Sequence, residues 1–410
     1  MNDNIKEILE ETNYFAEEEY ERRREARLAR IEAEKKRQLL YRRLFLAGIG
    51  VILVVVLVIV GVNVIRHNIK KNRDIKPDDT VTEADMNNQT GDDTNETPAD
   101  IDPNVTVDDN IVYNSYGKAR QFELVASDYD YSDTYAVAIT YPELYSQYGM
   151  VINVTDGKVV ASIQGNAKMY PASMTKVMTV LTAMQYISEE ELDELVEITQ
   201  EASDYAYSNG CAAVNYGVGA KVPVRDLFYG TILKSGADAA YMLAVYTAGS
   251  HQAFVELMNE NCVALGIADT THFSNCVGIY TDDNYSTCHD MAVIMNAAEK
   301  NVFLSEVLNT RQYVTVPTDN YPEGVKISNL FLRRIEDYDT MGVVCAAKTG
   351  FVNQSGNCAV SYMLGIDGKE YICVTGHGNS AWQEIYDHIA LYNIYAMNNT
   401  GYDGPVKMTN

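Results

Sequence analysis

The stretch MVINVTDGKVVASI, residues 150–163, decides the fold class of this 410-residue chain. Apolar residues run on both sides of Asp156-Gly157, a dipeptide that favours a tight turn between antiparallel strands. We therefore expect a β-hairpin here. Three later apolar runs are also expected to be strands: 343–349, 358–364 and 371–375. The sheet must then be assembled from both ends of one domain.

Helical patterns fill the sequence between these strands. Helices are expected over 174–187, 224–233, 239–248, 252–265 and 286–298, with a closing helix over 381–397. An early hairpin, a long helical middle and late antiparallel strands predict an α/β fold. We expect a sheet flanked by helices, together with an all-helical subdomain.

Charge is unevenly placed along the chain. The formal net charge is −25, which argues against a nucleic-acid partner because phosphates are bound by clustered cations. Residues 1–43 lack Pro and Gly and place Glu near Arg and Lys at helical spacing. This segment is expected to be a charged cytoplasmic helix, either solvated or in a coiled coil, and it is a candidate contact for another protein.

Residues 44–65 form an apolar run long enough to cross a membrane, since about 20 helical residues span the hydrocarbon core. The run is too long, and too far from the N-terminus, for a cleaved signal peptide. More cations precede it than follow it, so a single-pass anchor with a cytoplasmic N-terminus is expected. Polar residues 66–119 would form a flexible extracytoplasmic stalk, followed by a domain at 120–400 and a tail at 401–410.

Three short motifs carry the chemistry of the domain. Ser173 and Lys176 stand three residues apart at an expected helix start, so the amine can reach the hydroxyl. Ser235-Gly236-Ala237 lies between two expected helices, and Lys348-Thr349-Gly350 closes an expected strand. Each motif alone is weak evidence, but this order is the signature of class A β-lactamases and penicillin-binding proteins.

With its surrounding residues the chain resembles the D-alanyl-D-alanine carboxypeptidases, the low-molecular-weight penicillin-binding proteins. The resemblance is carried by residues 150–176, 227–235, 271–292 and 348–358, and it covers roughly 151–393. It implies a β-lactamase/DD-peptidase-like antiparallel sheet, no cofactor and no metal. The implied substrate is the stem peptide of peptidoglycan, with β-lactams as covalent inhibitors.

The residues themselves suggest how such a reaction would begin. Ser173 is the expected nucleophile, and Lys176 is its base if burial and the nearby cation Lys348 keep the amine neutral. Ser235 is expected to relay a proton between Lys176 and the leaving amine. The expected outcome is removal of the terminal D-Ala through an acyl-enzyme on Ser173.

The third motif is expected to bind the other end of the substrate. Lys348 and Thr349, beside Gly350, would hold the free carboxylate of the terminal D-Ala or of a β-lactam. The backbone N–H groups of Ser173 and Phe351 would form the oxyanion hole. Substrate binding is therefore assigned to Lys348, Thr349, Gly350, Phe351 and position 237.

Position 237 is where the chain departs most from the family. Ala237 stands where an Asn is usual, and Cys276 and Asn284 replace a usual Pro and His. An amide that would bind substrate is therefore missing. Its absence is compatible with slower turnover, with a different peptide substrate, or with a penicillin-binding protein that no longer hydrolyses. A receptor that signals through the N-terminal segment is therefore an alternative. A DD-endopeptidase also remains open, as does a β-lactamase with the same three motifs, although no Glu between Lys176 and Ser235 is well placed to activate a deacylating water.

The seven cysteines are expected to be reduced, small apolar residues. If Asp367-Gly368 is a two-residue turn, Cys373 lies opposite Tyr362 and not opposite Cys358. An odd number of cysteines also leaves one without a disulfide partner in the same chain.

Overall fold

The computed structural model describes residues 112–126 and 136–408. The helix expected at 1–43, the apolar run at 44–65 and most of the stalk lie outside the described residues. Among the residues that are described, no helix has the length and apolar character needed to cross a membrane.

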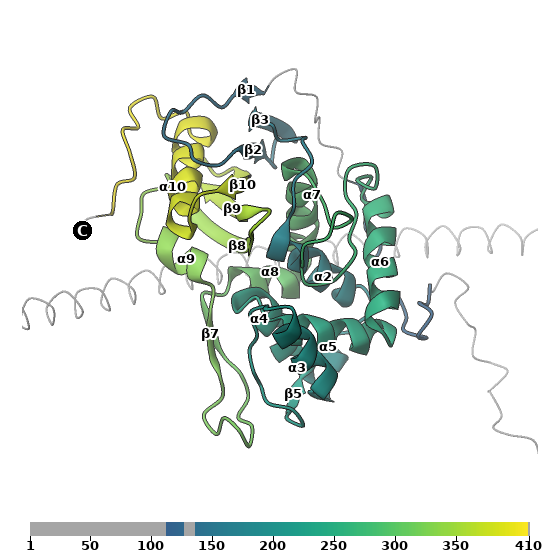
Figure 1. The fold of residues 1–410 in the computed structure, drawn as a ribbon. Coiled ribbons are helices and arrows are strands. Elements are labelled where there is room, and N and C mark those ends of the chain that lie inside the picture. The colour runs from purple at the N-terminus through teal and green to yellow at the C-terminus, as the bar shows by residue number, and fades with distance from the viewer. Residues whose placement is uncertain (1–111, 127–135, 409–410) are drawn as a thin grey trace, which may run out of the picture. The chain divides into compact units, whose positions relative to one another are not determined.

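A six-stranded sheet forms the centre of the domain (Figure 1). Its order is β1-β3-β2-β10-β9-β8, and neighbouring strands are antiparallel except for β1 and β3. The strands are β1 (Val137–Ala138), β2 (Tyr148–Asn153), β3 (Lys158–Ile163), β8 (Gly342–Val352), β9 (Gly356–Gly365) and β10 (Glu370–Gly378). The predicted hairpin is confirmed, and β2 pairs with β10 from the other end of the domain.

Helices cover both faces of the sheet and form the helical subdomain. They are α2 (Thr175–Met184), α3 (Gln200–Ser208), α4 (Val224–Leu233), α5 (Ala237–Ala248), α6 (His251–Ala264), α7 (Cys288–Glu299), α8 (Val302–Asn309), α9 (Leu330–Ile335) and α10 (Ala381–Leu391). Two small sheets pair β4 (Leu195–Glu197) with β5 (Lys221–Pro223) and β6 (Gln312–Val314) with β7 (Lys326–Ser328). Every helix predicted within the described residues is present, whereas α3, α8 and α9 were not predicted.

Side chains that alternate along the strands pack into two separate hydrophobic cores, one on each face of the sheet. Met150 and Ile152 point toward the helices of the subdomain, whereas Val151 points toward Ile385 and Ile389 of α10. Figure 1 shows the same division, with α10 on one side of the sheet and α2 and α7 on the other. The nucleophile helix α2 is buried along its whole length, packed against α7, α5, α4 and α6.

Most surface helices begin at a side chain that caps the first turn. Thr199, Ser250, Thr287 and Ser380, for example, each accept a hydrogen bond from a backbone N–H at the start of α3, α6, α7 and α10. No side chain caps α2 or α5 in this way. These two helices begin at the first and second motifs, and the first N–H of α5, from Ala237, donates to Ala212 O.

The register predicted between β9 and β10 is wrong by one residue. Cys373 lies opposite Ser361, and Ile372 takes the place opposite Tyr362. The reason is the turn, which closes with Gly365 N–H donating to Lys369 O at 2.8 Å and places Gly368 at φ +78°. Three residues therefore lie in the loop instead of two. All seven cysteines are free in the structure.

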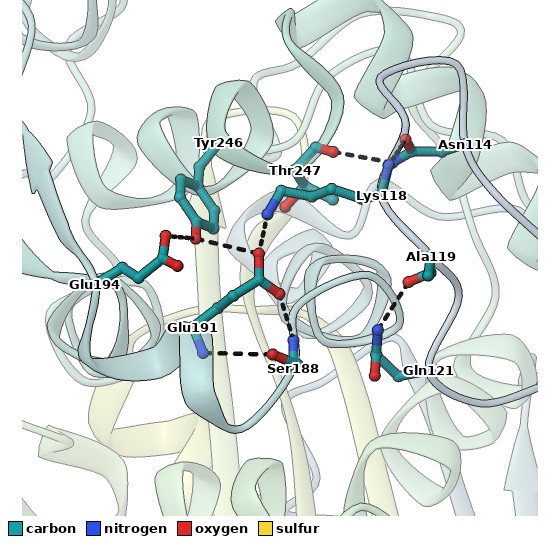
Figure 2. Close-up of polar contacts among 9 residues, drawn as sticks. All are labelled: Asn114, Lys118, Ala119, Gln121, Ser188, Glu191, Glu194, Tyr246 and Thr247. Atoms are coloured by element: carbon teal, nitrogen blue, oxygen red, sulfur yellow. Dashed lines mark hydrogen bonds and ion pairs between the residues drawn. The ribbon is translucent and has the colours of Figure 1, made fainter. Parts of the chain in front are cut away.

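The folded part of the chain begins earlier than residue 120. Residues 112–126, here called the strap, start with a tight hairpin in which Tyr113 pairs with Ala119. Asn114 of this hairpin is buried, and its Nδ2 donates to Thr247 O at 2.9 Å near the end of α5. Figure 2 shows this contact. Lys118 pairs with Glu191 and lies 4.1 Å from the centre of the Tyr246 ring.

The strap continues across the far end of the nucleophile helix. Gln121 N–H donates to Gln185 O at 2.6 Å, and Arg120 donates to the Tyr186 hydroxyl at 3.0 Å. At the other terminus the expected tail also packs on the domain, since Asp339 N–H donates to Val406 O at 3.0 Å. Asn114, in the segment assigned to the stalk, and Val406, in the segment assigned to the tail, thus make hydrogen bonds with the domain.

Candidate active site

The first motif forms the start of the nucleophile helix. Pro171 precedes a short 3₁₀ turn, Ala172–Met174, which leads into α2. Lys176 Nζ donates to Ser173 Oγ at 3.0 Å and to Val277 O at 2.7 Å. The two side chains predicted to act together are thus in direct contact.

Lys176 is suited to act as a base because it is almost fully buried. Its side chain is 1% exposed, and this desolvation lowers its pKa from 10.5 to about 8, against the opposing pull of Cys211, Cys276 and Asp238. The expected repulsion between the Lys176 and Lys348 ammonium groups is felt at Lys348. Repulsion from Lys176 adds to burial in lowering the pKa of Lys348 well below its usual value.

The second and third motifs meet through a similar contact. Lys348 Nζ donates to Ser235 Oγ at 3.0 Å and to Thr349 O at 2.7 Å. Ser235 has φ +58°, an uncommon backbone conformation for a residue other than glycine. The predicted relay has Ser235 facing Lys176, but in this structure its hydroxyl faces Lys348.

Two glycines let the backbone approach the nucleophile closely. A Cβ at Gly278, which has φ +84°, would lie 1.8 Å from Ala172 O. A Cβ at Gly350 would lie 2.9 Å from Ser173 N. The third motif therefore needs its glycine for packing against the nucleophile turn.

Asn275 fixes the loop that contacts Lys176. Its Oδ1 accepts from the N–H groups of Val277, Gly278 and Ile279 at 3.2, 2.7 and 3.0 Å. These bonds hold Val277 O where it receives the second hydrogen bond of Lys176. Sequence reasoning named this stretch only as part of a resemblance and gave Asn275 no role.

The second motif is fastened to the loop at residues 211–215. Ala237 N–H donates to Ala212 O at 2.8 Å. The carboxylate of Asp238 accepts from Val214 N–H at 2.9 Å and from Asn215 N–H at 2.8 Å. The sequence did not identify Asp238 as an anchor, because the N–H groups that donate to its carboxylate come from a distant loop.

Ala237 was predicted to line the substrate site, but its side chain has no exposed surface. A fully buried methyl group offers a ligand no contact in this conformation. What position 237 supplies is the backbone bond to Ala212.

The outer part of the third motif remains accessible. Thr349 is half-buried, and Phe351 is 59% exposed on β8, an edge strand of the sheet. Alternate backbone groups of an edge strand point away from its neighbour. Thr349 O accepts from Lys348 on this side, so the Phe351 N–H, two residues on, points the same way.

Within the described ranges, no three His, Cys, Asp or Glu side chains are grouped so that they could hold a metal ion.

Comparison with known proteins identifies the family to which this chain is similar. The family model described as D-alanyl-D-alanine carboxypeptidase matches residues 135–375. The D-alanyl-D-alanine carboxypeptidase of Streptomyces sp. strain K15 is 35% identical over 186 residues, covering 44% of this chain and 63% of that protein. DacA of Escherichia coli K12, with the same description, is 34% identical over 165 residues, covering 39% and 41%. The chain thus spans less than two thirds of either relative.

Solved structures give the same assignment for the fold. The Streptomyces K15 DD-transpeptidase superposes with a TM-score of 0.55 at 28% identity, covering 62% of this chain and 99% of that one. A D-alanyl-D-alanine carboxypeptidase from Mycobacterium tuberculosis, at 23% identity and a TM-score of 0.55, shares the fold. The family match includes all three motifs and the hairpin before them. The chain belongs to the D-alanyl-D-alanine carboxypeptidase family.

Proposed function

We propose that this protein is a serine D-Ala-D-Ala carboxypeptidase that trims peptidoglycan stem pentapeptides and is acylated by β-lactams. The observation that carries the proposal is the 3.0 Å contact between Ser173 Oγ and a buried Lys176 whose pKa is lowered to about 8. A neutral amine at this place can accept the serine proton. Family membership and the names of the two relatives support the substrate class.

Acylation begins when Ser173 Oγ attacks the carbonyl carbon of the penultimate D-Ala and its proton passes to Lys176 Nζ. The oxyanion is held by the backbone N–H groups of Ser173 and Phe351. The peptide bond then breaks, and Lys176 gives up the proton that it received, which passes through the Ser235 hydroxyl to the departing nitrogen and leaves Lys176 neutral again. Water attacks the resulting ester, returns a proton to Ser173 through Lys176, and releases the shortened peptide.

Substrate binding would also prepare Ser235 for the relay. In the absence of ligand, Lys348 donates to Ser235 Oγ. The free carboxylate of the terminal D-Ala is a counter-ion for Lys348 and raises its pKa again. The Lys348 ammonium and Thr349 hydroxyl then bind the carboxylate, which frees the Ser235 hydroxyl to face the leaving nitrogen.

Covalent labelling tests the nucleophile. Penicillin should form one adduct, located at Ser173 by peptide mass spectrometry, and Ser173→Ala should form none. Ser208→Ala, at an exposed serine on α3, is the matched control and should label normally. Incubation with a pentapeptide should release D-Ala, seen as a loss of one residue in product mass. An adduct elsewhere would reject the assignment.

Transfer of the acyl group to an amine is a second candidate outcome. It is favoured by the solved structure of the Streptomyces relative, which is named a DD-transpeptidase. Adding a D-amino acid as acceptor separates the two, because transfer gives a product of the acceptor's added mass whereas hydrolysis does not. A protein that is acylated by penicillin but converts no peptide would instead be a receptor, as the N-terminal helix suggested.

The proposed location is the outer face of the cell membrane. Residues 44–65 would be the anchor, with residues 1–43 in the cytoplasm and the stalk outside. This places the catalytic domain where its proposed wall substrate is found. External protease on cells without their outer layers should cut between residues 77 and 110 and release an active domain. Protection of that stretch would contradict the orientation.

A further inference from the structure

A cavity of about 330 Å³ lies beside the second motif but contains none of the three motifs' catalytic side chains. We name it the α3 pocket, since one wall is the face of α3 that carries Ser203 and Asp204 and the other is the loop with Cys211 and Asn215. Pockets of this size hold small ligands or substrate side chains.

Backbone hydrogen bonds join the α3 pocket to the catalytic centre. Asp238 lies in its wall and accepts from Val214 and Asn215 N–H, while Ala237 N–H donates to Ala212 O. The loop is thus tied to the two residues that follow Ser235-Gly236. A Cβ at Gly236 would lie 2.7 Å from Val214 Cγ2, so the loop also packs directly on the motif. Cys211 and Asp238 are in addition electrostatic neighbours of Lys176.

The loop presents polar groups to the pocket in a constrained shape. Asn215 is exposed and has φ +64°, a left-handed conformation that Asn adopts more readily than most residues. Asp238 holds it there through the Asn215 N–H. Because the Asp238 carboxylate accepts three backbone N–H groups, it is occupied by the loop and by its own helix.

The charge of the wall indicates what the pocket would accept. Its charged lining residues are both acidic, Asp204 and Asp238. Asp204 is exposed on α3, and its Oδ1 accepts from Gln200 Nε2 at 2.7 Å, which orients the carboxylate. Ser203 and Asn215 add neutral hydrogen-bonding groups. A side chain that ends in an ammonium group matches this lining, whereas an anionic one does not.

We propose that the α3 pocket binds an amine-bearing side chain of the peptide substrate, with Asp204 as the residue that recognises its charge. This rests on the proposed function, because it assigns a specificity subsite to that same reaction. Asp204 does not touch the reacting atoms, so it selects among peptides without taking part in bond breaking.

The first test compares two peptides that differ only in one charge: Nα-acetyl-Lys-D-Ala-D-Ala and its Nε-acetylated form. The natural protein should favour the free amine in kcat/KM by roughly two- to fivefold, the usual worth of a partly exposed ion pair. Asp204→Asn should bring the ratio to about 1. Asp269→Asn, which removes an exposed carboxylate elsewhere, should keep the natural ratio. An unchanged ratio in Asp204→Asn would overturn the proposal.

The second test fills the pocket in the folded protein. In a Cys345→Ser background, which removes the other partly exposed thiol, N-ethylmaleimide is used to modify Cys211. Turnover of the lysyl peptide should fall by roughly tenfold or more, since small misplacements of a substrate cost this much. The 6-amino group of 6-aminopenicillanic acid carries no acyl side chain that could reach the pocket, so acylation by this compound should change less than about twofold by the same reasoning. No effect on the peptide, or an equal loss for both ligands, would overturn the proposal.

The two proposals fail in different ways. Absence of both D-Ala release and 6-aminopenicillanic acid acylation in the natural protein would refute the enzymatic function itself. Normal acylation and D-Ala release, with no effect of Asp204→Asn and no effect of Cys211 modification, would refute only the α3 pocket as a subsite.

Discussion

The pH dependence of acylation tests the central role given to Lys176. Burial lowers the pKa of this amine to about 8, and only its neutral form can accept the Ser173 proton. The neutral fraction is therefore about 10% one pH unit below that pKa, about 50% at it and about 90% one unit above. The acylation rate constant should thus rise about tenfold between pH 7 and pH 9 by the same arithmetic.

The shape of the pH profile of acylation depends on how far the pKa of Lys176 is lowered. A lysine with its ordinary pKa of 10.5 would be almost fully charged at pH 8, so the rate would keep rising steeply to pH 10 and beyond. The lowered pKa instead predicts a plateau above about pH 9. Stopped-flow measurement of penicillin acylation from pH 6 to 10 distinguishes these curves, with the folded state checked by circular dichroism at each pH.

Substitution of Lys176 gives the matching control. Lys176→Ala should slow acylation by about 10²–10⁴-fold and remove the pH dependence near 8. Lys158→Ala, at an exposed lysine on β3, should leave rate and profile unchanged. A rate that is flat from pH 6.5 to 9.5 in the natural protein, or a loss below about threefold in Lys176→Ala, would show that another group is the base.

Three further outcomes are expected from the packing of the domain. Gly278→Ala should destabilise the fold or abolish acylation, because its Cβ would lie 1.8 Å from Ala172 O; thermal unfolding and penicillin labelling measure both, and normal values in both would refute the close approach. Ala237→Asn should lower the free energy of unfolding by about 1–3 kcal/mol, since the site is fully buried. Ala212→Asn on the exposed loop should leave the free energy of unfolding unchanged. An Ala237→Asn enzyme that is more stable and is acylated faster would contradict this. Asn114→Ala should lower the free energy of unfolding by about 1–3 kcal/mol, because it removes the buried hydrogen bond to Thr247 O. Gln121→Ala, exposed on the same strap, is the control in urea unfolding. Equal stability of the two variants would show that the Asn114 bond does not stabilise the domain.

Local signals in the sequence were sufficient for the elements and the motifs. The hairpin around Asp156-Gly157, the helix over 224–233 and the late strands follow from periodicity and turn residues, which act over a few positions. Ser173 and Lys176 are three residues apart, so helix geometry alone brings them together. The short helices α3, α8 and α9 were missed because so few turns give little periodicity to recognise.

Only the tertiary structure decided how distant residues complete the site. The Lys348–Ser235 and Lys176–Val277 contacts join positions 113 and 101 residues apart, and no local pattern encodes such pairings. The same holds for Asp238, whose carboxylate anchors a loop more than 20 residues earlier in the chain, and for Cys373, whose facing residue depends on one extra residue in a turn. Sequence periodicity specifies which face of an element is buried, but the packing of whole elements determines which buried faces meet.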